Sequence, residues 1–272
     1  MFFQPNRAEV LRRCGDGLVL DVGGWADPFH RADYVLDCFD YETRGILYNG
    51  VGRLADTVRH PDPLPGERFT RETWKTQDIC GTQPFPFPDK MFDFVLCSHT
   101  LEDIRDPLRV CGELIRVAKA GYIETPSRLV EQTVGLDGTV GAPHHRWLVE
   151  MTEGRVAFTM KSSHLHWHRP ALIPTAYTHR LPPETKVTWL FWNDGFEYGE
   201  RIVDDALEDA SRFAALHPVP AHLRIRQVLG GWKHRLKGSP SQELTGPKVE
   251  NGTWTWKKLL KASLPKSSTL WT

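Results

Sequence analysis

The chain has 272 residues, of which 40% are hydrophobic and 25% charged, an ordinary globular composition that excludes disorder as its main state. The formal net charge is zero, from 34 basic and 34 acidic residues. The charge is unevenly placed, because residues 221–272 contain ten Lys or Arg against two Glu, a net charge of +8 that the rest of the chain offsets.

The N-terminal residues, the hydropathy and the cysteines indicate in which cellular compartment the protein is found. No window approaches the roughly 18 apolar residues of a membrane span, and the first residues, MFFQPNRAEVLRRCG, have no small-residue cleavage site. The five cysteines are odd in number and lack CxxC spacing, which suits buried thiols better than a disulfide framework. We therefore predict a cytoplasmic protein without a transmembrane segment.

Apolar runs stopped by glycine or charge predict the first strands. GLVLDVGG (17–24) and ADYVLD (32–37) are typical of strands buried on both faces of a parallel sheet. The pattern weakens over 41–71, and WKTQDI (74–79) is the best candidate for the third strand.

The most regular segment predicts one β-α-β unit. FDFVLCSH (92–99) reads as a strand, Asp106 and Pro107 as a helix N-cap and first-turn proline, and YIETP (122–126) as the next strand. We expect Gly121 to end the helix and the two strands to be parallel. The helical spacing is carried by Leu108, Cys111, Leu114, Ile115 and Ala118.

Beyond residue 128 the pattern changes to hairpins and then helices. Residues 146–161 alternate around Thr-Glu-Gly, and residues 186–202 alternate around Asn-Asp-Gly, so each predicts a hairpin. Helical patterns follow at 203–218 and 220–238, and residues 238–272 are rich in Ser, Pro, Thr and Lys.

These elements together predict an α/β fold, a Rossmann-like, doubly wound and mostly parallel sheet with a terminal antiparallel hairpin. We expect one domain over residues 1–237, with a β-hairpin insertion after the fifth strand within 129–185. Residues 238–272 are then a basic C-terminal tail containing Trp and Lys.

Ligands of such sheets bind at the carboxyl ends of the strands, and the first two strands end in residues suited to a nucleoside. Asp21, Gly23 and Gly24 end the first strand, where glycine allows a tight turn and close approach to main-chain N–H groups. Asp37 ends the second strand and can accept hydrogen bonds from a ribose diol.

The next two strands end in Asp78 with Ile79, which suit an adenine amino group and ring face, and in Ser98 with His99. None of these strand ends offers a Lys or Arg fork for phosphate. Residues 24–31 are also too few for the usual crossover helix, which takes about 10 residues or more with its loops. A phosphate-free sulfonium nucleoside therefore fits better than a dinucleotide.

The stretches VLDVGGWADPFHRADYVLD and DICGTQPFPFPDKMFDFVLCSHTLEDIRDP resemble the class I S-adenosylmethionine-dependent methyltransferases, in particular their methyltransferase-domain group. The resemblance implies that Asp21, Gly23 and Gly24 line the methionine part of the cofactor. It implies that Asp37 binds the ribose and Asp78 the adenine, with 129–185 forming a substrate lid.

Two positions depart from the family pattern. Trp25 stands where the second loop glycine is usual, so its indole either packs beside S-adenosylmethionine or occupies its place. Asp103 replaces a frequent histidine.

The resemblance implies in-line methyl transfer to an O or N atom of a small-molecule acceptor, such as a sugar or a natural-product intermediate. Such an enzyme aligns donor and acceptor, excludes water and in some cases supplies one base. The candidate bases are His99, Glu124, His144 and His145.

Two other classes of function stay open. A scaffold protein with a degenerate fold would have Trp25 blocking the pocket. A metal enzyme would use His164, His166 and His168, which share one face if they lie on a strand, together with His144 or His145. We predict no metal, because neither Cys nor Asp lies beside them at ligand spacing.

The Trp, Leu and Lys residues of the tail could touch a membrane surface, nucleic acid or a partner subunit. We favour a tethered surface segment or a homodimer contact. Nucleic-acid methylation is disfavoured because the positive charge is concentrated in the tail.

Overall fold

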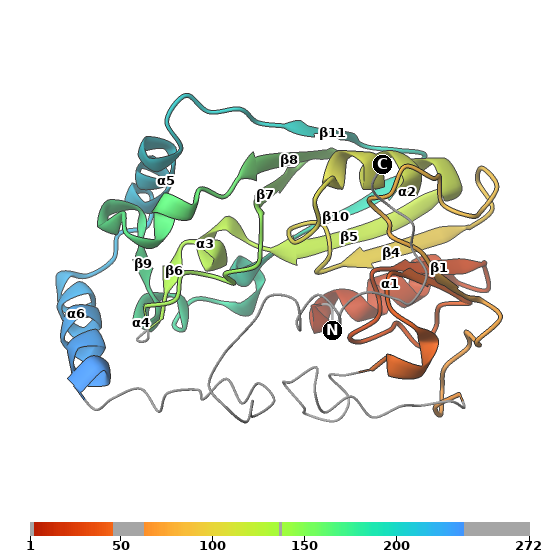
Figure 1. Cartoon of the computed structure of the whole chain (residues 1–272), viewed down its shortest axis with the longest axis horizontal. Helices are drawn as coiled ribbons and strands as arrows, with labels where there is room; N and C mark the ends of the chain where they lie inside the picture. The colour runs from red at the N-terminus through yellow and green to blue at the C-terminus, as the bar shows by residue number, and fades with distance from the viewer. Residues whose placement is uncertain (1–2, 46–62, 136–137, 237–272) are drawn as a thin grey trace, which may run out of the picture.

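The computed structural model describes residues 3–45, 63–135 and 138–236 (Figure 1). Its centre is a six-stranded sheet of order β10-β5-β4-β1-β2-β3, in which β10 alone runs antiparallel to its neighbour. The predicted Rossmann-like α/β fold with a mostly parallel sheet is confirmed. The strands are β1 (Val19–Val22), β2 (Tyr34–Asp37), β3 (Trp74–Thr76), β4 (Phe94–Ser98), β5 (Ala120–Pro126) and β10 (Val187–Asn193).

Both faces of this sheet are buried because successive strand residues alternate between two apolar clusters. Leu20 and Val22 of β1 pack in the cluster that contains the inner side of α2 (Pro107–Val117), whereas Val19 packs in the cluster that contains α1 (Arg7–Cys14). This alternation is the period of two that a strand imposes on its side chains. It explains why the strands read as continuous apolar runs in the sequence.

Helix α2 begins where the sequence predicts and ends earlier. The carboxylate of Asp106 accepts a hydrogen bond from the Arg109 N–H at 3.0 Å, and Pro107 occupies the first turn. The expected stop at Gly121 is wrong, because the chain is already extended at Ala118 and Gly121 lies inside β5. A Cβ at Gly121 would lie 2.6 Å from the ring of Trp192, so this glycine lets β10 pack against β5.

The crossover between β1 and β2, residues 23–33, contains turns and no helix. This agrees with the expectation that residues 24–31 are too few for one. The segment from β3 to β4, residues 77–93, likewise contains no helix.

The insertion after β5 contains the first predicted hairpin. Strands β7 (Trp147–Thr152) and β8 (Arg155–Met160) pair antiparallel across a turn that places Gly154 at φ +77°. The positive φ explains the glycine, since other L-residues rarely adopt it. The hairpin prediction for residues 146–161 is therefore confirmed.

The second predicted hairpin, and with it the terminal antiparallel hairpin of the expected fold, is wrong. Strand β10 pairs with β5 along seven residues, whereas β11 (Glu197–Glu200) leaves the main sheet and pairs parallel with β8. The backbone N–H of Glu197 bonds to the carbonyl of Gly154, which starts this second ladder. The result is a separate three-stranded sheet, β11-β8-β7.

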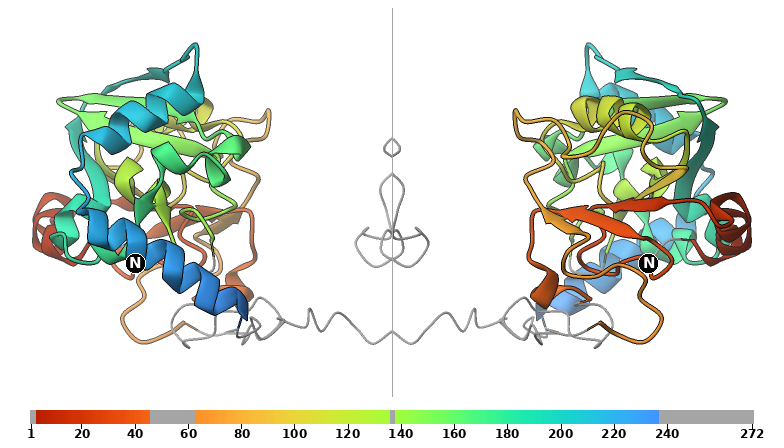
Figure 2. Two further views of the ribbon diagram at one scale, coloured as in Figure 1. Left: turned by 90° about the vertical axis from the view of Figure 1, so that its left-hand side faces the viewer. Right: turned by 90° about the vertical axis from the view of Figure 1, so that its right-hand side faces the viewer.

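The remaining helices gather at one end of the molecule, beyond the end of the main sheet (Figures 1 and 2). Helices are found where both C-terminal patterns predict them. The elements here are α3 (Arg128–Glu131), β6 (Thr133–Val134), β9 (Ile173–Pro174), α4 (Thr175–Thr178), α5 (Ala206–Ala215) and α6 (Ala221–Leu236).

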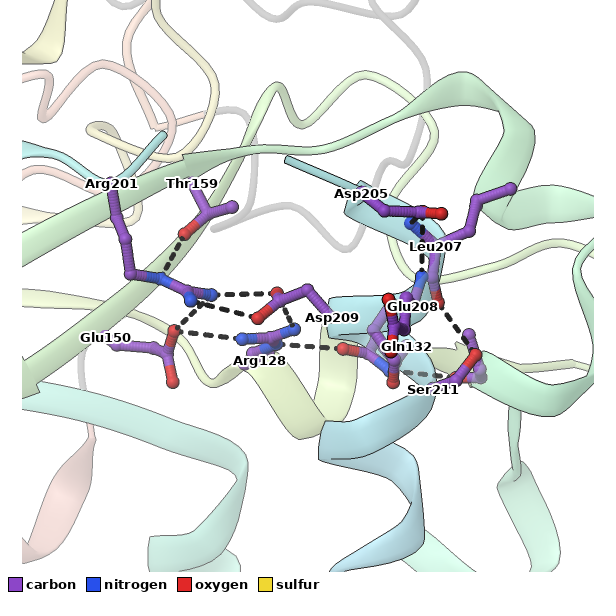
Figure 3. Close-up of polar contacts among 12 residues, drawn as sticks. Arg128, Gln132, Glu150, Thr159, Arg201, Asp205, Leu207, Glu208, Asp209 and Ser211 are labelled. Atoms are coloured by element: carbon purple, nitrogen blue, oxygen red, sulfur yellow. Dashed lines mark hydrogen bonds and ion pairs between the residues drawn. The ribbon is translucent and has the colours of Figure 1, made fainter. Parts of the chain in front are cut away.

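Ionic contacts tie this end to the insertion (Figure 3). Arg128 of α3, whose side chain is 5% exposed, contacts Asp209 of α5 at 2.5 Å and Glu150 of β7 at 3.1 Å. Arg201 reaches the same Asp209 at 2.8 Å and donates to Thr159 Oγ1 of β8 at 3.0 Å. One carboxylate on α5 therefore holds together segments far apart in the sequence.

The proposed tail, residues 238–272, lies outside the described residues, as does residue 237 at the end of the expected domain. In the part of the chain that is described, no helix combines the length and the apolar character needed to cross a membrane.

Candidate functional site

A cavity of about 610 Å³ opens at the carboxyl ends of the central strands. The strand order reverses between β1 and β4, which is where ligands bind in open α/β sheets. The volume lies within the range of small-molecule sites, about 300 to 1,000 Å³. The wall comprises Gly23, Trp25, Ala26, Asp37, Cys38, Phe39, Asp78, Ile79, Cys80, His99, Thr100, Asp103, Ile104, Arg105, His144 and Arg146.

The loop after β1 contributes Gly23 to this wall, whereas Asp21 and Gly24 lie behind it. Gly23 has φ +77°, and a Cβ there would lie 2.2 Å from Thr100 Oγ1. A Cβ at Gly24 would lie 2.2 Å from an Asp21 carboxylate oxygen. Both glycines are thus required by close packing within the chain, a reason that the sequence did not reveal.

Asp21 is buried and organises the loop rather than facing the cavity. Its Oδ2 accepts a hydrogen bond from the Phe29 N–H at 2.8 Å. Burial raises the pKa of Asp21 to about 7, against the effect of that hydrogen bond. The described geometry therefore gives Asp21 a role in shaping the turn that leads to Gly23.

Asp37 and Trp25 meet on the cavity wall. Asp37 accepts hydrogen bonds from the backbone N–H groups of Trp25 and Phe39, each at 3.0 Å. Burial raises the pKa of Asp37 although these donors oppose the shift. The Trp25 indole N–H donates to Thr43 Oγ1 at 2.9 Å, and its ring stacks on that of Phe39 with the ring centroids 4.1 Å apart. These contacts fix the indole as part of the wall.

Of the residues predicted at the third and fourth strand ends, only some line the cavity. Asp78 and the buried Ile79 line the cavity, and Asp78 Oδ1 accepts from the Cys80 N–H at 2.9 Å. Ser98 is not part of the wall, and its buried Oγ has no hydrogen-bond partner among the described residues.

His99 lines the cavity between two buried glutamates. Its Nε2 lies 3.0 Å from Glu124 Oε1, and its Nδ1 lies 3.6 Å from Glu102 Oε1. Burial lowers the pKa of the imidazole, but the two carboxylates outweigh burial and raise the pKa to about 9. His99 is therefore a cation at neutral pH, and an imidazolium has no lone pair with which to accept a proton.

Glu124 is fully buried behind His99. Its carboxylate accepts from the Phe3 N–H at 2.9 Å and from the Tyr122 hydroxyl, besides contacting His99. Glu124 is not part of the cavity wall. Its carboxylate instead positions the His99 ring and raises the pKa of His99.

His145 lies behind the wall in a second buried carboxylate pair. Its Nδ1 is 2.8 Å from Glu131 Oε1, its Nε2 is 3.9 Å from Glu102 Oε1, and Glu131 also holds Lys161 at 2.5 Å. Burial would raise the pKa of Glu131, but His145 and Lys161 hold it below its ordinary value. This array joins the loop that precedes β7 to the β4 end of the sheet.

His144, the neighbour of His145, does line the cavity. It is exposed, and its ring packs edge to face on His145 at 4.5 Å. Arg146 lies on the same rim and is also exposed.

Several wall residues were missed by sequence reasoning. Cys38 and Phe39 directly follow Asp37, Thr100 directly follows His99, and Ile104 and Arg105 lie within the next six residues. Their closeness to strand ends was a usable signal. Arg146 had none, since only the folded insertion brings it to the cavity.

The proposed histidine cluster does not assemble. His164 and His166 lie in a 3₁₀ helix, Ser163–His166, rather than on a strand, and His168 Nε2 hydrogen-bonds with Ser211 Oγ at 2.9 Å. Across residues 3–45, 63–135 and 138–236, no group of three metal-ligating side chains is found.

Residues 64–123 match the family model described as "Methyltransferase domain". That range covers β3, β4, α2 and the first part of β5, which supply the Asp78 and His99 sides of the cavity. This segment of the chain is therefore similar to a methyltransferase domain. The loop from Leu20 to Asp40 lies outside the match, so its assignment depends on the geometry above.

No curated protein matches the sequence. Solved structures similar to this chain include a putative methyltransferase from Bacillus halodurans C-125 (18% identity, TM-score 0.30), covering 45% of this chain and 52% of that one. A putative sarcosine dimethylglycine methyltransferase from Galdieria sulphuraria is 21% identical, with TM-score 0.29 and coverages of 45% and 43%. An S-adenosylmethionine-dependent methyltransferase from Mesorhizobium loti is 17% identical, with TM-score 0.31 and coverages of 58% and 63%. The matched regions thus span only 43% to 63% of those proteins.

Proposed function

We propose that this protein transfers a methyl group from S-adenosylmethionine to an O or N atom of a small molecule. The observation that carries the proposal is the cavity at the β1/β4 switch point with Asp37 on its wall. When bound, S-adenosylmethionine supplies an electrophilic methyl carbon on its sulfonium sulfur.

The residues present fit the nucleoside part of this cofactor. A carboxylate offers about four lone-pair positions; the N–H groups of Trp25 and Phe39 use two of those on Asp37, which also hydrogen-bonds with Cys38. A ribose diol would bind on the side of the carboxylate that lines the cavity. Asp78 and Ile79 offer an acceptor and an apolar face beside Asp37 on the same wall, as an adenine would need.

His144 is the best candidate for a base among the four predicted residues. His99 is held protonated, and Glu124 and His145 lie behind the wall, each contacting other buried groups. His144 reaches the cavity and is exposed. A base there would take a proton from an acceptor hydroxyl or amine, while His99 would contribute a fixed positive charge.

The acceptor would enter past the segment that carries His144 and Arg146. This supports a lid role for part of the 129–185 insertion, since its loop before β7 forms one side of the cavity. The array of Glu102, His145 and Glu131 would hold that loop in place.

The proposal is tested by calorimetric titration of the folded protein with S-adenosylmethionine and with S-adenosylhomocysteine. We expect Asp37→Ala to weaken both by about 1 to 3 kcal/mol, because ribose hydroxyls would lose their acceptor. Asp40→Ala is the matched control, as Asp40 is an exposed acid three residues away that does not line the cavity. Absence of binding by both ligands would overturn the proposal.

A substitution of Trp25 distinguishes the proposed methyltransferase from a non-catalytic protein with a degenerate fold. Its indole is tied to Thr43 and Phe39 and leaves a cavity of about 610 Å³, so we expect Trp25→Gly to weaken cofactor binding or leave it unchanged. Tighter binding by Trp25→Gly would favour the degenerate reading instead.

A further inference from the structure

Helix α6 presents an apolar stripe to solvent. Ile225, Val228 and Leu229 are 60%, 54% and 56% exposed. Spacings of three and four residues place these side chains on one face of an α-helix. Figures 1 and 2 show α6 at the outer end of the molecule, away from the central sheet.

The opposite face of α6 is the one that holds the helix to the protein. Leu223 is 1% exposed, and the Gln227 side-chain amide donates to the Gly135 carbonyl at 2.7 Å. Positions 223 and 227 each lie about 200° around the helix from Ile225, because successive residues are about 100° apart. The exposed stripe therefore faces directly away from the body.

Positive charge flanks the stripe on both sides. Arg224 and Arg226 are exposed, and as neighbours of Ile225 they lie about 100° to either side of it. From residue 220 to residue 242 the sequence has five Lys or Arg and neither Asp nor Glu. The balancing negative charge lies elsewhere in the chain, since the formal total is zero.

We propose that α6 docks this protein on an anionic phospholipid surface, lying in the interface with Ile225, Val228 and Leu229 inserted. An apolar face bordered by cations is the pattern of helices that bind in the plane of a membrane. The flanking arginines sit at headgroup level, where anionic lipids attract them.

A second copy of the chain fits the stripe less well. Symmetric pairing of two α6 helices would bring Arg224 and Arg226 of one copy close to those of the other. Three apolar side chains are also small against the roughly 800 Å² per partner that a stable interface buries.

The test is co-sedimentation of the full chain with vesicles of phosphatidylcholine, either alone or with about 30% phosphatidylserine. We expect binding only to the anionic vesicles, weakening as salt is raised because added ions screen the arginines. Ile225→Gln/Leu229→Gln should reduce binding about tenfold or more. Arg224→Gln/Arg226→Gln should reduce it about twenty-fivefold, since each surface charge contributes about fivefold.

Ile202→Gln and Leu216→Gln are matched controls, because these residues are 85% and 75% exposed but lie outside α6. We expect both to bind as the unchanged protein does. The C-terminal tail is present in every variant, so binding that survives Ile225→Gln/Leu229→Gln overturns the proposal. Absence of vesicle binding, or a dimer in size-exclusion chromatography that this double variant disrupts, also overturns it.

Discussion

The central sheet and the helical end of the molecule differ in the contacts that hold their elements together. In the sheet, β1, β4 and β5 bury apolar side chains on both faces, and glycines allow backbones and side chains to approach closely. At the helical end beyond the sheet the apolar clusters are small, and ionic contacts of Arg128, Asp209 and Arg201 join α3 and α5 to the β7–β8 hairpin (Figure 3). The sheet should therefore be sensitive to added volume, and the helical end should also be sensitive to lost charge.

The largest expected effect compares two glycines with the same φ of +77°. Gly154 in the insertion hairpin has open space around its missing Cβ, whereas a Cβ at Gly23 would lie 2.2 Å from Thr100 Oγ1. We expect Gly154→Ala to lower the free energy of unfolding by about 1 to 2 kcal/mol through backbone strain alone. Gly23→Ala should lower the free energy of unfolding by about 3 to 5 kcal/mol, because overpacking against Thr100 adds to that backbone strain.

Urea unfolding of both variants measures this difference. Adding Thr100→Ser to Gly23→Ala should recover part of the loss, since it removes the Thr100 methyl group 2.5 Å from the new Cβ. Equal losses at Gly23 and Gly154 would show that packing at the β1 turn is not the deciding factor.

The second prediction concerns charge at the helical end of the molecule. Asp209 contacts two arginines, so Asp209→Asn should lower the free energy of unfolding by about 2 kcal/mol through the partly unpaired Arg128. Glu208→Gln is the matched control. Among the described residues Glu208 pairs with Arg212 alone, in an exposed contact, where we expect a loss below about 0.5 kcal/mol.

This effect should depend on pH. Burial would raise the pKa of Asp209, but Arg201 and Arg128 hold it below its ordinary value. A carboxylate with a depressed folded pKa stabilises the protein above its unfolded pKa, and this contribution is lost as pH falls. The stabilities of the unchanged protein and Asp209→Asn should converge in acid, and a constant difference down to low pH would contradict the assignment.

The smallest expected effect on stability is at His99, which is only partly buried. With a pKa of about 9, its charged form stabilises the fold fully below the unfolded pKa of about 6.5, and the contribution is lost as pH rises through 9. The facing charged groups are Glu124 and Glu102. NMR titration of the ring should show the high pKa, and Glu124→Gln should lower it. An unshifted pKa in that variant would remove Glu124 as the cause.

Local sequence pattern could predict much of the sheet and part of the site. Strands β1, β2, β4 and β5 are apolar runs, and parallel strands bring their carboxyl ends together, so Asp37, Asp78 and His99 could be placed at one edge. The path of β11 could not be predicted, because alternation over 186–202 suits a hairpin and two separate ladders equally well.

The sequence by itself determined the fold class and the acid-bearing strand ends, because strand period and turn chemistry are local properties of the chain. Tertiary structure alone decided which histidine reaches the cavity. His144 and His145 are adjacent in sequence, but one lines the wall and the other lies between Glu131 and Glu102. It also decided that Trp25 forms a wall, since Thr43 and Phe39 hold its ring only in the folded chain.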